Sequence, residues 1–376
     1  ISFNGARPEP DGTYSEATKN FLVGVVIHEV GHNFFPMVVN SDERQWAWMD
    51  EGINSFLEYL AEQEWDRNFP SDRGPARTIV DYMRAERGTL QPVMSNAESV
   101  TDLGSNAYGK PAAALNILRE TVMGRELFDY ALKEYARRWA FRHPTPADFF
   151  RTLEDASGMD LDWFWRGWFY TTDPVDLAIE NVRHFRPDTR DRAVEKPRLR
   201  RERAAERPDV GVERNRTDVP RTLLEERPEL RDFYDAYVEL DPQPGDAAAH
   251  RAYLATLTDE ERRALRSGTH LYELELRNVG GLVMPVILEM EYEDGTREVR
   301  RFPAEIWRFT PDRVLKTIAT DRPVRRFTLD PQQETADVDV ENNSFPRQAA
   351  ESRFQLFKRQ GGKAPNPMQL SREVGP

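Results

Sequence analysis

Two histidines and a glutamate near the start of the chain have the types and spacing of a metal-dependent hydrolytic site. They are His28, Glu29 and His32, in the stretch VVIHEVGHNFFP. Residues four apart lie on one face of an α-helix, so the two imidazoles can bind one metal ion. This is the HExxH arrangement, in which the histidines bind zinc and the glutamate is the general base on a zinc-activated water. The alternative is that the paired histidines only cap or line an apolar helix.

A third ligand should follow, because a catalytic zinc usually has three protein ligands and an open fourth position. Eighteen residues separate His32 from Glu51, which lies in the stretch WAWMDEGINSFLEYL. Two helices packed antiparallel could bring this carboxylate opposite the histidines. Taken alone, Glu51 could instead be one of the many acidic residues that stabilise a helix N-terminus. Together with His28 and His32, it predicts a site for one Zn²⁺ ion.

Apolar periodicity predicts the two helices that position these residues. The first runs through Phe21 to Phe35, and Pro36 should end it, because the proline ring clashes with the carbonyl four residues before it. The second begins near Asp50. It carries an apolar stripe at helical spacing: Ile53, Phe56, Leu57 and Leu60.

With these motifs the chain resembles the gluzincin zinc peptidases of the aminopeptidase N class, which include the leukotriene hydrolase aminopeptidases. That family has HExxH, eighteen residues, and then Glu in a Trp-x-Asn-Glu-Gly stretch. This chain has HEVGH and WMDEG, with Asp50 in place of Asn. The resemblance implies His28, His32 and Glu51 as zinc ligands, and Glu29 as general base.

The resemblance also implies a downstream tyrosine that stabilises the oxyanion of the tetrahedral intermediate. In the family it belongs to a Tyr-Glu-Lys-Gly segment that opens a helix. This chain has AYGKPAAALNIL, where Tyr108 and Lys110 match, and Gly109 and Pro111 depart. Without the zinc site, Tyr108 would be interpreted as a packing residue.

The predicted function is zinc-dependent hydrolysis of peptide bonds, with peptides as substrates and removal of N-terminal residues as the expected reaction. Two alternatives stay open, namely a gluzincin endopeptidase and a non-catalytic binding scaffold. The family recognises a free N-terminus through a Gly-x-Met-Glu-Asn stretch upstream of HExxH, and ISFNGARPEPDGTYSE does not contain it. The residues that bind substrate are therefore left unassigned.

The expected fold class is α+β and multidomain. Residues 1–175 should form a mainly helical, thermolysin-like zinc-peptidase catalytic domain. Residues 176–268 are interpreted as a first strand followed by a charged, partly helical insertion or linker. Residues 269–344 should form a small β-domain, in which Asp294-Gly295 signals a hairpin, and residues 345–376 a polar C-terminal tail.

Composition limits the partner classes. The 376 residues carry a net charge of -13, so nucleic acid is not expected as a partner. No apolar run approaches the roughly 18 to 20 residues of a membrane-spanning helix, and the lack of cysteine excludes disulfides and a thiolate nucleophile. The chain starts at Ile1 rather than Met, which suggests the later part of a longer protein. Oligomeric state and compartment are left open, with export or the periplasm favoured over the cytoplasm.

Overall fold

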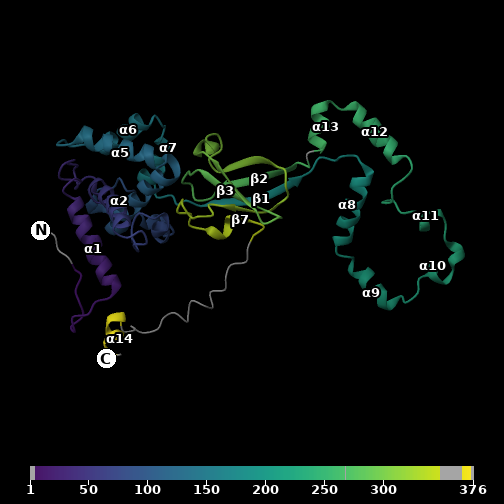
Figure 1. Cartoon of the computed structure of the whole chain (residues 1–376), viewed down its shortest axis with the longest axis horizontal. Coiled ribbons are helices and arrows are strands. Elements are labelled where there is room, and N and C mark those ends of the chain that lie inside the picture. The colour runs from purple at the N-terminus through teal and green to yellow at the C-terminus, as the bar shows by residue number, and fades with distance from the viewer. Residues whose placement is uncertain (1–4, 267, 348–365, 374–376) are drawn as a thin grey trace. The chain divides into compact units, whose positions relative to one another are not determined.

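A computed structural model describes residues 5–266, 268–347 and 366–373 and shows an α+β protein (Figure 1). The chain divides into two compact units. The larger comprises residues 1–182, 274–316 and 324–376, and the smaller comprises residues 183–273 and 317–323. The predicted fold class is confirmed, because a helical region is followed by two small sheets.

Helices form the first part of the larger unit. They are α1 (Glu16–Gly31), α2 (Ala47–Trp65), α3 (Val80–Met83), α4 (Lys110–Ile117), α5 (Arg125–Trp139), α6 (Pro146–Ser157) and α7 (Asp162–Trp165). Three further segments are π-helical: Gly104–Gly109, Leu118–Met123 and Arg166–Tyr170. These elements span most of the region in which the sequence predicts the catalytic domain.

Helix α1 ends earlier than its sequence predicts. Its last residue is Gly31, not Phe35. The Asn33 and Phe34 amides donate to carbonyls three residues back, at 3.1 and 2.8 Å, which tightens the chain into a turn. Proline disfavours a helical backbone in the residue before it, so this turn leads into Pro36. The second histidine of the motif consequently stands at the C-cap of α1.

An aromatic cluster holds the start of α2 in place. Trp48 is fully buried. The centroid of its ring lies 4.6 Å from that of Phe169, 5.6 Å from that of Phe149 and 5.8 Å from that of Phe150. Such aromatic pairs contribute about 0.5–1.5 kcal/mol each beyond the burial of their area. Because Glu51 follows Trp48 by one helical turn, the same packing fixes the backbone that carries it.

Two small sheets follow the helices. The three-stranded sheet has the order β1 (Leu177–Phe185), β2 (His270–Asn278), β5 (Arg313–Thr320). The four-stranded sheet has the order β4 (Arg297–Phe302), β3 (Val286–Tyr292), β6 (Val324–Leu329), β7 (Ser344–Phe345). Strands β3 and β4 pair antiparallel around Asp294 and Gly295, with Gly295 at φ 82°, so the predicted hairpin is confirmed.

Short helices with mostly exposed side chains make up much of the smaller unit. They are α8 (Arg192–Ala205), α9 (Val210–Asp218), α10 (Leu223–Glu226), α11 (Phe233–Ala236), α12 (Asp246–Thr256) and α13 (Asp259–Arg266). Helix α14 (Pro367–Glu373) falls in the predicted C-terminal tail. The rest of that tail, residues 348–365 and 374–376, lies outside the described residues.

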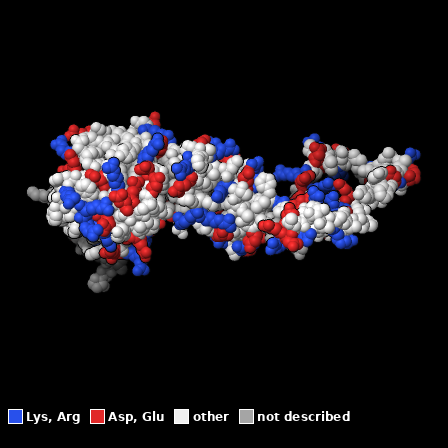
Figure 2. All heavy atoms as spheres, turned by 90° about the horizontal axis from the view of Figure 1, so that it is seen from above, with Lys and Arg blue, Asp and Glu red and all other residues white. Residues whose placement is uncertain are grey.

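Charged side chains of both signs are interspersed on the face shown in Figure 2. Many form exposed ion pairs, such as Arg44 with Glu98 at 2.5 Å. Exposed pairs contribute only about 0–1 kcal/mol each, so the apolar core carries most of the stability. Among the described residues, no helix has the length and apolar character needed to cross a membrane.

Candidate metal centre and catalytic cleft

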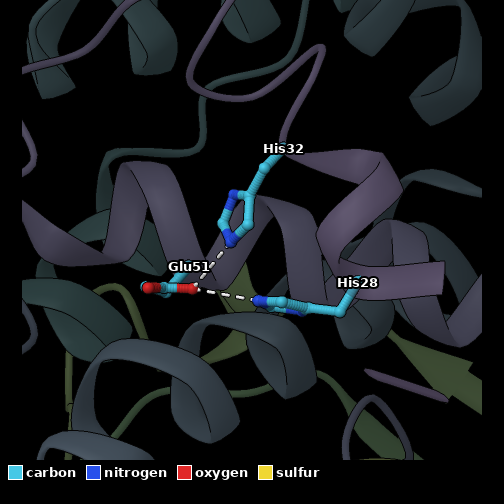
Figure 3. Close-up of side chains that lie close together, drawn as sticks. All are labelled: His28, His32 and Glu51. Atoms are coloured by element: carbon cyan, nitrogen blue, oxygen red, sulfur yellow. Dashed lines mark hydrogen bonds and ion pairs between the residues drawn. The ribbon is translucent and has the colours of Figure 1, made fainter. Parts of the chain in front are cut away.

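The structure brings the three predicted zinc ligands together (Figure 3). His28 and His32 come from the C-terminal end of α1, and Glu51 from the first turns of α2. Glu51 Oε2 lies 3.0 Å from His28 Nε2 and 3.3 Å from His32 Nε2. One ligand atom of each residue thus lies within 4.8 Å of the other two. Two imidazoles and a carboxylate are a donor set of catalytic zinc sites, so these residues fit a zinc ion.

A glycine inside the motif lets α1 and α2 approach closely. Asn54 of α2 donates a hydrogen bond from Nδ2 to the His28 carbonyl, at 2.7 Å. A Cβ atom at Gly31 would lie 2.0 Å from Asn54 Oδ1, far inside contact distance. Gly31, the glycine of HEVGH, therefore makes room for a buried hydrogen bond that joins the two helices carrying the predicted ligands.

Acidic side chains orient both imidazoles from outside the ligand set. Glu58 Oε2 lies 3.0 Å from His28 Nδ1, and Asp50 Oδ1 lies 3.0 Å from His32 Nδ1. His32 Nδ1 also donates a hydrogen bond to the Phe35 carbonyl oxygen at 2.9 Å. A hydrogen bond at Nδ1 fixes the ring and leaves Nε2 for a metal ion. The sequence analysis assigned neither role. A signal for Glu58 was present, because it follows Glu51 by two helical turns and so shares its helix face.

Hydrogen bonds in this cluster shift the pKa values of its members. Burial opposes the charge on His28, but hydrogen bonds to Glu51 and Glu58 outweigh it and raise its pKa to about 9. A hydrogen bond to Asp50, followed by one to Glu51, raises the pKa of His32 to about 11. Burial also opposes ionisation of Glu51, yet hydrogen bonds from both histidines lower its pKa to about 2. Zinc binds neutral imidazoles, so metal binding here must displace protons.

Tyr108 lies beside the ligands, on the π-helix Gly104–Gly109. Its ring stacks on the His28 imidazole with the centroids 5.8 Å apart. The guanidinium carbon of Arg73 lies 4.5 Å from the centroid of the Tyr108 ring, on the ring face. Burial, followed by a hydrogen bond to Glu51, raises the pKa of the phenol well above its usual range. The hydroxyl is consequently a proton-bearing donor at neutral pH.

A second glycine allows Tyr108 to come this close. Gly52 directly follows Glu51 in α2 and faces the segment around Tyr108. A Cβ atom at Gly52 would lie 2.4 Å from Pro111 Cγ and 2.9 Å from the Ala107 carbonyl oxygen. The glycine of WMDEG is therefore required for the contact between α2 and the segment that carries the tyrosine.

Glu29 lines the same cavity as the ligands and Tyr108. The cavity has a volume of about 620 Å³ and lies between α1, α2 and the loop after α2. Its other lining residues include Phe21, Gly24, Ser55, Glu58, Tyr59, Glu62, Phe69, Asp72 and Arg73. The sequence analysis left the substrate-binding residues unassigned, since only the packing of these three elements brings them together.

Comparison with known proteins finds similarity to peptidases. Residues 9–168 match the peptidase family M1 domain. Glutamyl aminopeptidase of Bos taurus is 26% identical over 197 residues, which cover 50% of this chain and 20% of that protein. Aminopeptidase N of Lactococcus lactis subsp. lactis is 24% identical over 166 residues, which cover 42% of this chain and 19% of that protein. The chain thus spans about a fifth of the length of these curated relatives.

One similar solved structure is that of Legionella pneumophila aminopeptidase A in complex with aspartic acid. The similarity covers 86% of this chain and 27% of that chain, with 11% sequence identity and a TM-score of 0.49. The segment that matches the M1 domain contains both histidines of the motif, Glu29, Glu51 and Tyr108. The predicted resemblance to the gluzincin aminopeptidases is confirmed, because residues 9–168 are similar to the peptidase family M1 domain.

Proposed function

We propose that this chain hydrolyses peptide bonds as a zinc metallopeptidase and removes residues from the N-terminus of peptides. The observation that carries the proposal is the convergence of His28, His32 and Glu51 within 4.8 Å, on a cavity that Glu29 and Tyr108 also line. A binding scaffold has no physical need for these five residues together. The similarity to proteins named aminopeptidases supports the exopeptidase form of the reaction.

His28, His32 and Glu51 would hold the metal ion, with Glu58 and Asp50 orienting the two imidazoles. When bound, zinc supplies Lewis-acid chemistry, because it polarises the substrate carbonyl and lowers the pKa of a water molecule to about 7. Side chains of this protein carry out the proton transfer and stabilise the oxyanion.

Glu29 carries the proton. Its carboxylate accepts a proton from water as the water oxygen attacks the peptide carbonyl carbon, and it then delivers that proton to the leaving amine nitrogen as the C–N bond breaks. Glu29 follows His28 on α1, and its side chain lines the cavity beside the ligands. It therefore lies where a general base has access to both water and substrate.

Tyr108 stabilises the charge that develops on the carbonyl oxygen. Its hydroxyl donates a hydrogen bond to this oxyanion, and a preorganised donor of this kind is most effective in a cavity from which water is excluded. The raised pKa keeps the proton on the phenol while the substrate carbonyl becomes negative. Stacking on His28 and the close approach at Gly52 hold the ring in position.

We expect Tyr108→Phe to lower kcat by about 10²- to 10³-fold, the usual effect of removing one oxyanion donor. Zinc content should change little, because the phenol is not a predicted ligand and Phe keeps the stacked ring. Steady-state kinetics together with metal analysis of the purified variant would check this. If kcat stayed at the parent value, Tyr108 would have only a packing role.

The proposed function is tested with a peptide library in which every peptide is made with a free and with an acetylated N-terminus. The zinc-loaded protein is incubated with both sets, and products are identified by mass spectrometry. We expect stepwise loss of N-terminal residues from the free peptides only. Internal cuts in the acetylated peptides would favour the endopeptidase alternative, and no cleavage of any peptide would contradict the proposal for this chain.

A further inference from the structure

An arginine lies in the acidic cavity beside the predicted catalytic tyrosine. Arg73 belongs to the loop after α2 and is the one Lys or Arg among the described residues that line this cavity. Several acidic residues line the same cavity, namely Glu29, Glu51, Glu58, Glu62 and Asp72. The mechanism proposed above gives this cation no role.

The guanidinium group of Arg73 contacts two residues of the site. Its carbon atom lies 4.5 Å from the centroid of the Tyr108 ring, over the ring face. Its Nη1 atom lies 3.7 Å from Glu58 Oε2. A cation over an aromatic ring is attracted by the electron-rich ring face, and the attraction is stronger where water is partly excluded. Arg73 therefore contacts the tyrosine ring and the carboxylate at the same time.

These contacts complete a closed set of four side chains that includes the predicted ligand His28. Glu58 Oε2 lies 3.0 Å from His28 Nδ1. The His28 imidazole and the Tyr108 ring are stacked, with an angle of 24° between their planes and 5.8 Å between their centroids. Arg73 contacts the tyrosine and also the carboxylate that orients this imidazole. It thereby couples the position of the phenol ring to that of a predicted metal ligand.

The loop that carries Arg73 is anchored to α2 on both sides of the arginine. Before it, the buried Ser71 hydroxyl donates a hydrogen bond to Glu62 Oε2 at 2.5 Å. After it, Gly74 has φ 92°, and a Cβ atom there would lie 2.5 Å from Tyr59 Cγ. Glycine is the residue that adopts such a backbone at no steric cost and allows so close an approach. The backbone on either side of Arg73 is thus held against α2, which limits where its side chain can reach.

Contacts with the ring face are the ones that can hold Tyr108 during the reaction. In this structure its hydroxyl hydrogen-bonds to Glu51. In the proposed reaction the hydroxyl donates to the oxyanion instead, so the bond to Glu51 cannot position the ring at that stage. The contacts with His28 and Arg73 involve the ring and not the hydroxyl, and they persist when the hydroxyl changes its acceptor. Oxyanion stabilisation requires a donor that is already in position.

We propose that Arg73 is a positioning residue that acts through Tyr108. Its guanidinium group holds the phenol ring from the ring face, so that the hydroxyl stays directed at the oxyanion. This role serves the peptide hydrolysis proposed above and so rests on that proposed function. Arg73 makes no contact with the substrate in this role, and its removal should therefore change kcat rather than KM.

Steady-state kinetics of zinc-loaded Arg73→Met test this role. Methionine is unbranched but uncharged, so we expect kcat to fall by about 5- to 30-fold, the loss that a partly desolvated cation–π contact can explain. KM and zinc content should stay at the parent values. Arg73→Lys keeps a cation that can lie over the ring and should retain most of kcat. Arg67→Met, at an exposed position of the same loop, is the matched control and should keep parent kinetics.

A double-mutant cycle separates a role through Tyr108 from an independent one. Once Tyr108→Phe has removed the hydroxyl, adding Arg73→Met should lower kcat by less than about twofold, because no donor is left to position. Losses that multiply in the double variant would overturn the proposal, since they indicate two independent effects. Parent-like kinetics of Arg73→Met would also overturn it. A raised KM with parent kcat would do the same and would indicate that the guanidinium group binds substrate directly.

Failure of the proposed function can be separated from failure of this role by a measurement that needs no hydrolysis. Fluorotyrosine is incorporated at position 108 of the zinc-loaded protein, and its fluorine NMR resonance is recorded. We expect one narrow resonance in the parent and in Arg67→Met. Arg73→Met should give a broadened or split resonance, because the ring can then take more than one orientation. Equal line widths in all three proteins would contradict the role of Arg73, whether or not peptides are cleaved.

Discussion

Glu29→Gln is expected to leave zinc binding intact and to lower kcat by about 10²- to 10⁴-fold, the range typical of a general base. Glutamine has the shape of glutamate but cannot accept a proton at neutral pH. The ligand cluster should stay assembled, because its hydrogen bonds run among the histidines, Glu51, Glu58 and Asp50. The loss should appear in kcat rather than in KM, since the proton moves during the chemical step.

The measurement pairs steady-state kinetics with metal analysis of the same preparation. Glu16→Gln is the matched control, because it is the same substitution at an exposed position of the same helix. It should retain parent activity. Parent-like turnover in zinc-loaded Glu29→Gln would remove Glu29 from the mechanism, and a loss of zinc would show that its role is structural.

The proximity of the two histidines could be predicted from sequence because their spacing follows from helix geometry. His28 and His32 share a face through the four-residue repeat, and that relation holds even though α1 ends at Gly31 and places His32 at the cap. The end of the helix was predicted wrongly. The rule applied at Pro36 describes a clash inside a helix, whereas the chain leaves the helix before the proline and closes a turn.

The partners outside the ligand set could not be predicted because they depend on packing between helices. Glu58 meets His28 only when α2 crosses α1 at the distance that Gly31 and Asn54 permit. No periodicity within α2 shows where α1 will lie.

The β-region shows the same division between local and long-range structure. Asp294-Gly295 predicts the β3–β4 hairpin because its signal is contained in a few neighbouring residues. The pairing of β3 with β6 is antiparallel and joins Leu288 to Leu329. This pairing has no comparable local signal, because side-chain packing on a shared face determines which strands pair when they are distant in sequence.

Glu51→Ala should weaken zinc binding more than any change outside the ligand set. It removes the carboxylate whose Oε2 atom lies 3.0 and 3.3 Å from the two histidine nitrogens and leaves two imidazoles as the protein ligands. Glu58→Gln is the graded control, because it alters the hydrogen bond at His28 Nδ1 and the ion pair with Arg73 but leaves all three predicted ligands in place. Loss of such an outer partner lowers metal affinity by roughly 10- to 100-fold.

Both variants and the parent are dialysed against a series of chelator concentrations, and zinc retained per chain is measured by elemental mass spectrometry. We expect the parent to lose its zinc only at the highest chelator concentration. Glu58→Gln should lose zinc at a lower concentration, and Glu51→Ala at the lowest. Circular dichroism tests whether each variant is folded. We expect Glu51→Ala to fold, because the aromatic cluster around Trp48 fixes the start of the helix that carries Glu51. Equal zinc retention by Glu51→Ala and the parent would show that Glu51 is not a ligand. The acidic partner of the two histidines would then have to be Asp50 or Glu58, which already contact their outer nitrogens.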